Sequence, residues 1–361
     1  MKKKILVLLG LAIILVVVVL IFVSCKTAAT AETTAAAATA AETTAAATTA
    51  AEVTEVVAGD ESACADCHND TTVIFSKETQ YSNSVHGTGL NFERNDAGCA
   101  VCHTSEGFTA RVAAGATLAV ADDATAIQNA SPVNCRTCHN IHTTYTKADW
   151  ALKTVAPVTL EFTGDVYDKG NSNLCASCHQ PRPGTDIPVA GGPAVEITST
   201  RYGPHHGPQS SMLLGVGGFG EYKGSSVHYD ATENGCIDCH MTDSAFGKQA
   251  GGHTWRMGYV FHEAETEFLA GCLKCHEDIE SFDRNGVETE LAPMVEELRL
   301  LLVKQGLIDD TGAGIAGTFT AEQAGALWNY KTFTEDRSNG LHNPGFGKFL
   351  LQTGIDAIKK K

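Results

Sequence analysis

Hydrophobic residues are spread very unevenly along this chain of 361 residues. Three lysines at positions 2–4 precede a continuous apolar run from Ile5 to Val23, which is the pattern of an export signal and is about long enough to span a bilayer. Residues 27–55 are almost entirely Ala, Thr and Glu, and so few large apolar side chains cannot bury a core. The predicted regions are an export signal or membrane anchor over 1–25, a disordered tether over 26–60 and a folded domain over 61–361.

Apolar residues recur at regular helical spacing near the C-terminus of the folded domain. Leu291, Val295, Leu298 and Leu302 would share one face of an amphipathic helix that ends near Gln305. Elsewhere the domain is rich in glycine, and its repeated cysteine motifs, described below, are separated by short spacings; both features favour loops and short helices. The predicted fold is therefore mainly α with extensive loops, and its regular helices lie within residues 285–361.

Two further helices are indicated by their start signals. The sequence Thr320-Ala-Glu-Gln323 is a capping box, and it predicts a helix that runs to about Thr334. Pro344 suits the first position of a third helix. Its apolar side would carry Phe346, Phe349, Leu350 and Ile355.

The chain repeats one short motif, Cys-x-x-Cys-His, six times. In this motif the two thiols are close enough to bond to the two vinyl groups of one haem, and the adjacent imidazole is held against the iron. The sequence therefore predicts six covalently bound c-type haems. The motifs are Cys64/Cys67/His68, Cys99/Cys102/His103, Cys135/Cys138/His139, Cys175/Cys178/His179, Cys236/Cys239/His240 and Cys272/Cys275/His276.

Zinc and disulfides are the alternative uses of these cysteines. Pairs of Cys-x-x-Cys knuckles can hold zinc, but a zinc knuckle does not require the His that follows every pair here. A disulfide framework would suit an exported protein. However, thirteen cysteines minus the twelve in the motifs leave only Cys25. Haem is therefore the favoured interpretation.

Histidine is present in surplus as a second axial ligand. Fourteen histidines minus the six in the motifs leave eight for six irons. Methionines 212, 241, 257 and 294 could also ligate, but with this surplus we favour two histidines at every iron, a combination that lowers the reduction potential. The predicted distal ligands are His86, His142, His206, His228, His253 and His342.

The local sequence supports these choices unequally. His86 and His228 share the context Ser-Val-His, which suggests one local structure used twice. His142 lies three residues after His139, too close to reach the opposite face of the same iron, so it would serve a neighbouring haem.

The remaining histidines lie in varied contexts. His253 and His342 lie near turns or element ends, and His342 just precedes the third helix. In Gly-Pro-His-His-Gly-Pro one of His205 and His206 would ligate, and we slightly favour His206. His262 is expected to be an ordinary hydrogen-bonded histidine.

Several of these segments resemble the multihaem cytochrome c superfamily, which includes pentahaem nitrite reductase and hydroxylamine oxidoreductase. They are Cys236-Ile-Asp-Cys-His-Met241, His253-Thr-Trp-Arg256, Leu327-Trp-Asn-Tyr330 and Gly340-Leu-His-Asn-Pro344. The resemblance covers residues 61–361 and implies closely packed haems, mostly with two histidines each, under C-terminal helices that cover the last haems. Nitrite reductases usually carry Cys-x-x-Cys-Lys at the catalytic haem, and no motif here ends in Lys, so ammonia-forming nitrite reduction is not expected.

Two functions follow from this pattern. The favoured one is an electron carrier that passes electrons between a membrane or periplasmic donor and an external acceptor. The alternative is an oxidoreductase with one open iron that acts on a small nitrogen or sulfur compound, with His205 or His262 as its acid or base. The formal charge of -16 argues against nucleic-acid binding and favours basic redox partners.

The end of the apolar run bears on how the protein is anchored. Phe22-Val-Ser-Cys25 resembles a lipoprotein signal-peptidase site, although Leu is more usual where Phe22 stands. We favour a lipidated Cys25, and an uncleaved anchor is the alternative. Either would tether an exported protein to a membrane, facing the periplasm or the cell exterior.

Replacing Cys25 with Ala is expected to abolish lipidation and change the processed size of the protein, because the modified thiol would be lost. Intact mass and membrane fractionation measure both effects. A Cys25→Ala protein that stays membrane-bound at the same processed size would show that the apolar run itself is the anchor.

Overall fold

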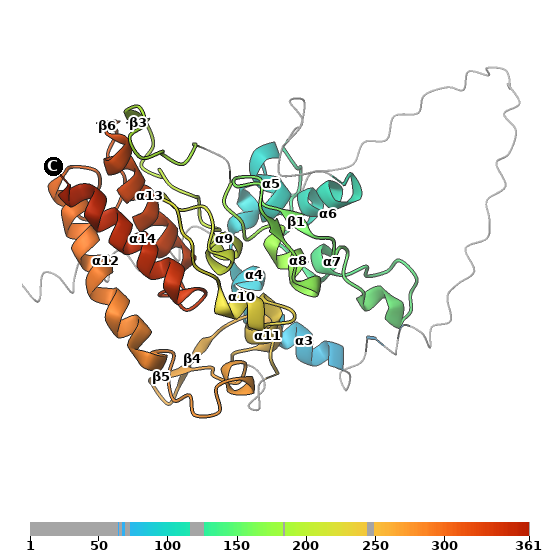
Figure 1. Ribbon diagram of the computed structural model, residues 1–361. Helices are drawn as coiled ribbons and strands as arrows, with labels where there is room; N and C mark the ends of the chain where they lie inside the picture. The colour runs from blue at the N-terminus through green and yellow to red at the C-terminus, as the bar shows by residue number, and fades with distance from the viewer. Residues whose placement is uncertain are drawn as a thin grey trace, which may run out of the picture. The chain divides into compact units, whose positions relative to one another are not determined.

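The computed structural model describes residues 64, 67, 68, 73–115, 126–182, 185–243 and 249–360 (Figure 1). All of them belong to one compact unit, Val57–Lys361. The predicted signal and tether, with Cys25, lie outside the described residues. None of the described helices combines the length and the apolar character needed to cross a membrane.

From residue 73 to about residue 286 the chain consists of short helical segments joined by loops. The α-helices are α3 (Val73–Ser82), α4 (Val85–Thr88), α5 (Ala97–His103), α6 (Ser105–Ala113), α7 (Cys135–Cys138), α8 (Asn173–Ala176), α9 (Gln209–Leu214), α10 (Val227–Ala231) and α11 (Cys236–His240). The 3-10 turns are η1 (Asn91–Glu93), η2 (Lys147–Trp150), η3 (Gly170–Ser172), η4 (Gly252–Thr254), η5 (Cys272–Lys274) and η6 (Arg284–Gly286). Such short helices cannot be stable alone, so their positions depend on what they pack against.

The described strands form three two-stranded antiparallel pairs. They are β1 (Val158–Thr159) with β2 (Val166–Tyr167), β3 (Val195–Ile197) with β6 (Gly317–Phe319), and β4 (Gly258–Phe261) with β5 (Ala264–Glu267). The β3–β6 pair joins the loop region to the segment just before the second long helix. The prediction of a mainly α chain with extensive loops is confirmed.

Three long helices end the chain, as predicted, and they pack on one another (Figure 1). They are α12 (Val287–Lys304), α13 (Ala321–Asp336) and α14 (Pro344–Lys359). The Thr320 capping box is formed, and Pro344 occupies the first turn of α14 with Asn343 as its N-cap. These boundaries were predictable because caps and apolar spacing are local signals.

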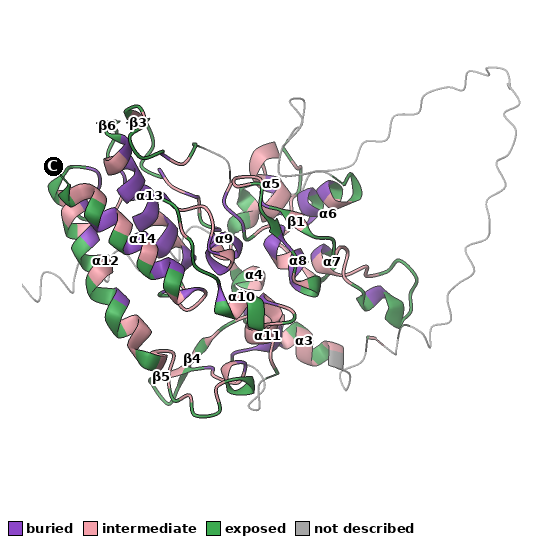
Figure 2. Ribbon diagram, in the orientation of Figure 1, coloured by how far each residue is buried: buried purple, intermediate pink, exposed green. Residues whose placement is uncertain are grey.

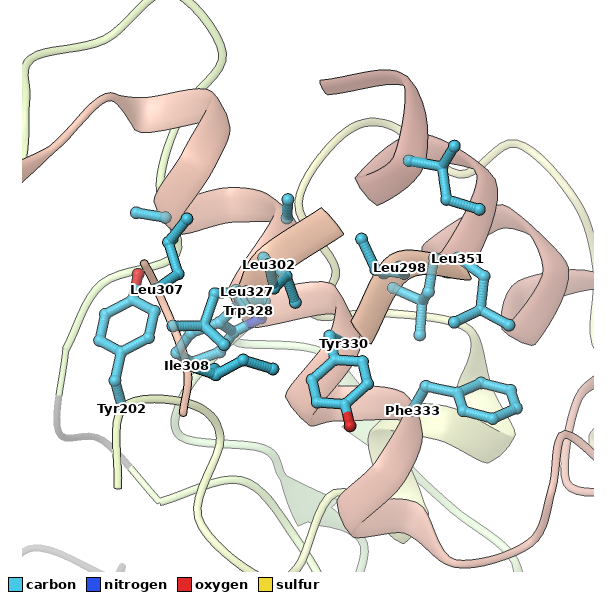
Figure 3. Close-up of a cluster of buried hydrophobic side chains, with 14 of the residues drawn as sticks. Tyr202, Leu298, Leu302, Leu307, Ile308, Leu327, Trp328, Tyr330, Phe333 and Leu351 are labelled. Atoms are coloured by element: carbon cyan, nitrogen blue, oxygen red, sulfur yellow. The ribbon is translucent and has the colours of Figure 1, made fainter. Parts of the chain in front are cut away.

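The second of these helices along the chain, α13, has no single apolar face because it is buried on nearly all sides (Figure 2). Leu302 of α12 lies beside Leu327 and Trp328 of α13, and Leu298 of α12 lies near Leu351 of α14, in the core between the helices (Figure 3). Small residues allow this close packing, and a Cβ at Gly325 would lie within 2.3 Å of the Phe219 ring.

Side chains of α13 also bind the loop region directly. The indole N–H of Trp328 donates to the carbonyl of Gly217 at 2.8 Å. The Asn329 amide oxygen accepts from the N–H of Phe219 at 2.7 Å, and its NH₂ group donates to the Phe219 and Leu350 carbonyls. Buried polar groups with all partners in place fix one arrangement, so the helical core holds the loop after α9.

Substituting Leu298 by Ala should lower the free energy of unfolding by about 2–5 kcal/mol, because its fully buried side chain would leave a cavity. Leu300→Ala on the same helix is the matched control. Leu300 is 53% exposed, and its truncation should change stability by less than about 0.5 kcal/mol. Guanidinium denaturation followed by circular dichroism measures both, and equal losses would contradict the assigned core.

Candidate haem-binding site

Each Cys-x-x-Cys-His motif forms a single helical turn. Four motifs show the closing hydrogen bond, in which the His N–H donates to the carbonyl of the first Cys at 2.7–2.9 Å. The other two motifs lie within α5 and α11. Residues three apart share one face of a helical turn, so this turn presents both thiols on one side with the imidazole beside them. The local structure therefore suits two thioether bonds and one axial ligand.

The motifs surround one connected cavity of about 2350 Å³. Its lining includes all twelve motif cysteines and every histidine except His262. Long helices contribute little to it, because only the first turn of α12, the last residue of α13 and the beginning of α14 reach it. The interior of this region is thus shaped for groups other than protein side chains.

Each motif histidine faces one other histidine across this cavity, with ring centroids 6.0–6.4 Å apart. In every pair the second histidine comes from outside the motif. The pairs are His68 with His142 (6.0 Å), His103 with His205 (6.4 Å), His139 with His253 (6.3 Å), His179 with His86 (6.1 Å), His240 with His342 (6.2 Å) and His276 with His228 (6.3 Å).

This donor set fits haem. Two metal–imidazole bonds of roughly 2 Å, with roughly 1 Å from each nitrogen to its ring centroid, account for a centroid separation of roughly 6 Å. Within the described residues no group of three or more His, Cys, Asp or Glu side chains could hold a metal ion. A pair of imidazoles therefore suits a metal whose other four ligands come from a macrocycle, as in haem.

The structure brings five of the six predicted distal histidines to this distance from a motif histidine. The exception is His206, which we replace by His205 as the predicted ligand. His205 has a φ of +65° and lies opposite His103, whereas His206 Nδ1 donates to Glu335 Oε2 at 2.7 Å. Nothing in the sequence Gly-Pro-His-His-Gly-Pro distinguishes two adjacent histidines that point to different partners.

His262, the other residue considered as an acid or base, does not line the cavity. It lies at the turn between β4 and β5, is exposed, and its ring contacts Phe261 at 4.2 Å between centroids.

The shared Ser-Val-His sequence corresponds to one local structure used twice. Ser84 and Ser226 are the N-caps of α4 and α10, and their hydroxyls accept from backbone N–H groups at 2.9 and 3.2 Å. The histidine that follows is the second residue of each short helix. Both serines are buried, so the cap is protected from water and fixes the direction of the imidazole.

His142 is positioned by hydrogen bonds within the loop that follows it, and not by a helix N-cap. Asp149 accepts hydrogen bonds from the backbone N–H groups of Thr143, Thr144 and Tyr145 at 2.7–3.1 Å. Burial raises the pKa of Asp149, but a hydrogen bond from the Thr144 hydroxyl at 2.6 Å, together with these backbone bonds, outweighs it and holds the pKa below its usual range. The tightened loop stacks the Tyr145 ring on His142 with an interplanar angle of 9°. Sequence reasoning missed Asp149, although an Asp after a Thr-rich segment is a loop signal.

Burial keeps several of the facing imidazoles neutral. Desolvation is the main cause that lowers the pKa of His86, His205 and His253 to about 4 in each case. The neutral ring is the form that binds a metal, so these histidines are ready to ligate at neutral pH.

Hydrogen bonds at Nδ1 orient the rings, and they leave Nε2 to face the cavity. His139, His228 and His240 have backbone carbonyls as partners, and His179 has an amide oxygen. The partners are Trp150 O (2.6 Å), Leu341 O (2.7 Å), Trp255 O (2.9 Å) and Gln209 Oε1 (3.2 Å), respectively. At His342 the partner is the Asp336 carboxylate; burial lowers the pKa of His342, but Asp336 reverses the shift, and the pKa is raised.

The pairs are linked to one another by close contacts. Trp255 touches the rings of His86 and His253, with centroids 4.8 and 5.5 Å apart, and its carbonyl is the partner of His240. Trp255 thus contacts ligands of three different motif pairs. Sequence reasoning missed this role, although Trp255 belongs to a segment singled out for its resemblance.

Cysteines of different motifs also lie close together. The interaction between Cys102 and Cys178 lowers the pKa of Cys102 and raises that of Cys178, and the interaction between Cys175 and Cys236 raises the pKa of Cys175 and lowers that of Cys236. The Cys175–His179 motif therefore lies at the centre of the group, in contact with its neighbours on several sides.

Six motif turns around one cavity, each with a facing histidine, are the features of a multihaem c-type cytochrome. The comparisons agree with this class. The C-type polyhaem cytochrome OmcB of Geobacter sulfurreducens, from strains DL-1/KN400 and PCA, is 28% identical over 236 residues, which cover 54% of this chain and 30% of the relative. The chain thus matches less than a third of the length of these relatives, and they support a multihaem cytochrome c. No family model matches the sequence.

Two solved structures are also similar. The outer cell wall cytochrome OcwA has a TM-score of 0.49 at 20% identity, covering 78% of this chain and 50% of that chain. The undecahaem cytochrome from the S-layer of Carboxydothermus ferrireducens has a TM-score of 0.39 at 18% identity, covering 79% and 40%. The relation to nitrite reductase and hydroxylamine oxidoreductase stays a prediction.

His205→Ala is expected to convert one iron from low spin to high spin, because its motif partner His103 would lose the facing ring. His206→Ala is the adjacent control and should leave all irons low spin. Electron paramagnetic resonance of the oxidised protein distinguishes them, with six haems attached in both variants. The reverse pattern would restore His206 as the ligand.

Proposed function

We propose that this chain is an electron-transfer protein with six haems, each attached through two cysteines and ligated by two histidines. The observation that carries the proposal is the facing histidine 6.0–6.4 Å from every motif histidine. Haem with two histidine ligands supplies reversible one-electron chemistry at low potential. With a residue on each side of every iron, no coordination position is left for a substrate.

The contacts between sites support transfer within the chain. Trp255 contacts histidines of three motif pairs, and cysteines of different motifs lie close together, so neighbouring haems would be close. The protein's own contribution is to hold the rings, exclude water and keep the imidazoles neutral.

The direction and partners belong to the same proposal. The predicted export signal and the Cys25 site favour a protein tethered to a membrane and facing the periplasm or the cell exterior. It would take electrons from a membrane or periplasmic donor and pass them to an external acceptor. The net charge of -16, to which haem propionates would add, favours partners with basic surfaces.

The oxidoreductase alternative has less support. It needs an open iron, but each motif histidine has a partner. Of the two histidines left over, His206 is bound to Glu335, and His262 lies outside the cavity.

Mass spectrometry of the mature protein should show six haem additions, and the oxidised wild type should give only low-spin signals. The reduced wild type should not bind carbon monoxide, because all its irons are six-coordinate. The His205→Ala variant serves as the positive control for binding. Stoichiometric binding of carbon monoxide or nitrite at one haem of the wild type would contradict the carrier and favour the enzyme.

A further inference from the structure

The segment between α13 and α14 carries a buried carboxylate next to a predicted haem ligand. The Asp336 side chain is fully buried, and its Oδ1 accepts from His342 Nδ1 at 2.7 Å. The Ser338 hydroxyl donates to the other carboxylate oxygen and accepts from the His342 backbone N–H at 3.2 Å. Carboxylate, hydroxyl and imidazole thus form a closed set of hydrogen bonds.

No other facing histidine among the described residues has a carboxylate at Nδ1. Among the other histidines of the six pairs, backbone carbonyls are the Nδ1 partners of His139, His228 and His240. His179 has an amide oxygen, and His142 has the Arg136 guanidinium at 2.9 Å. Within the part of the chain that the structure describes, the His240–His342 pair is also the one in which acceptors face both Nδ1 atoms, since His240 donates to the Trp255 carbonyl. Six similar His–His pairs are therefore electronically unequal.

An anionic acceptor at Nδ1 makes an imidazole a stronger donor to its metal than a neutral acceptor does. A stronger donor favours the more positive oxidation state of iron and so lowers the reduction potential. We propose that Asp336 makes the haem held by His240 and His342 the lowest-potential member of the set. The proposal rests on the proposed function, since it requires iron between these two rings.

A purely structural role for Asp336 would predict something else. If the carboxylate only fixed the ring, any loss of the contact would loosen His342, and every variant would shift the potential in the same direction. If Asp336 acts through its charge, the reduction potential should rise when the carboxylate is neutralised. It should fall when the Ser338 hydroxyl, which competes with His342 for the carboxylate, is removed.

The test is a redox titration of the six-haem protein followed by absorbance. In Asp336→Asn, which keeps an oxygen acceptor but removes the charge, the most negative component should move to higher potential. This component should account for about one sixth of the absorbance change, and all irons should still be low spin. In Ser338→Ala the carboxylate loses the Ser338 hydroxyl as a competing donor, so it accepts more strongly from His342 Nδ1, and the same component should move lower.

Glu335→Gln is the matched control. It removes the same charge one residue away, from a side chain bound to His206 and not to a facing histidine. It should leave the potential of the most negative component unchanged. This result would show that the Asp336–His342 hydrogen bond sets that potential, and not the loss of a nearby negative charge.

The proposal is overturned if Asp336→Asn leaves the lowest component unchanged, or if Ser338→Ala and Asp336→Asn shift it in the same direction. If Asp336→Asn does not assemble with six haems, Ser338→Ala decides alone: a downward shift supports the proposal, and any other result overturns it. Carbon monoxide binding by the wild type would instead count against the proposed function and can be recognised separately.

Discussion

The rest of this structure depends on holding two imidazoles opposite each other, with ring centroids about 6 Å apart, at six places. One ring of each pair is supplied locally by a Cys-x-x-Cys-His turn, but the other must be delivered from elsewhere. This requirement explains why the chain between α3 and α12 forms short capped helices and loops instead of long regular elements. Hydrophobic surface that would normally pack against a protein core faces the cavity instead.

The C-terminal helices supply the rigidity that the loop region lacks. Trp328 and Asn329 hold the loop after α9 through hydrogen bonds to Gly217 and Phe219. The connection from α13 to α14 then delivers His342, and Leu341 provides the carbonyl that orients His228. A conventional apolar core on one side thus positions the ligands of two different pairs, and damage to that core would be felt at the cavity.

The histidine pairs differ from one another in the groups that are hydrogen-bonded to Nδ1 of their rings. A carbonyl, an amide, a guanidinium and a carboxylate appear at Nδ1 of otherwise similar histidines. Because ligand basicity follows these partners, a chain of identical motifs can contain sites of different potential. Such differences give a multihaem carrier a direction without changing any residue of the attachment motifs.

The sequence by itself determined what is local. The attachment turns span five residues, the Ser-capped helices of His86 and His228 are set by their N-caps, and the three C-terminal helices follow from apolar spacing and start signals. Three features depend on the tertiary structure: which histidines face each other, the position of His205 instead of His206 opposite His103, and the contacts of Trp255 and Asp336. These features bring together residues that can be more than a hundred positions apart in the sequence, such as His139 and His253, and such residues meet only when the chain folds. Local signals determine a turn or a cap, but a facing pair requires two backbones to be placed independently.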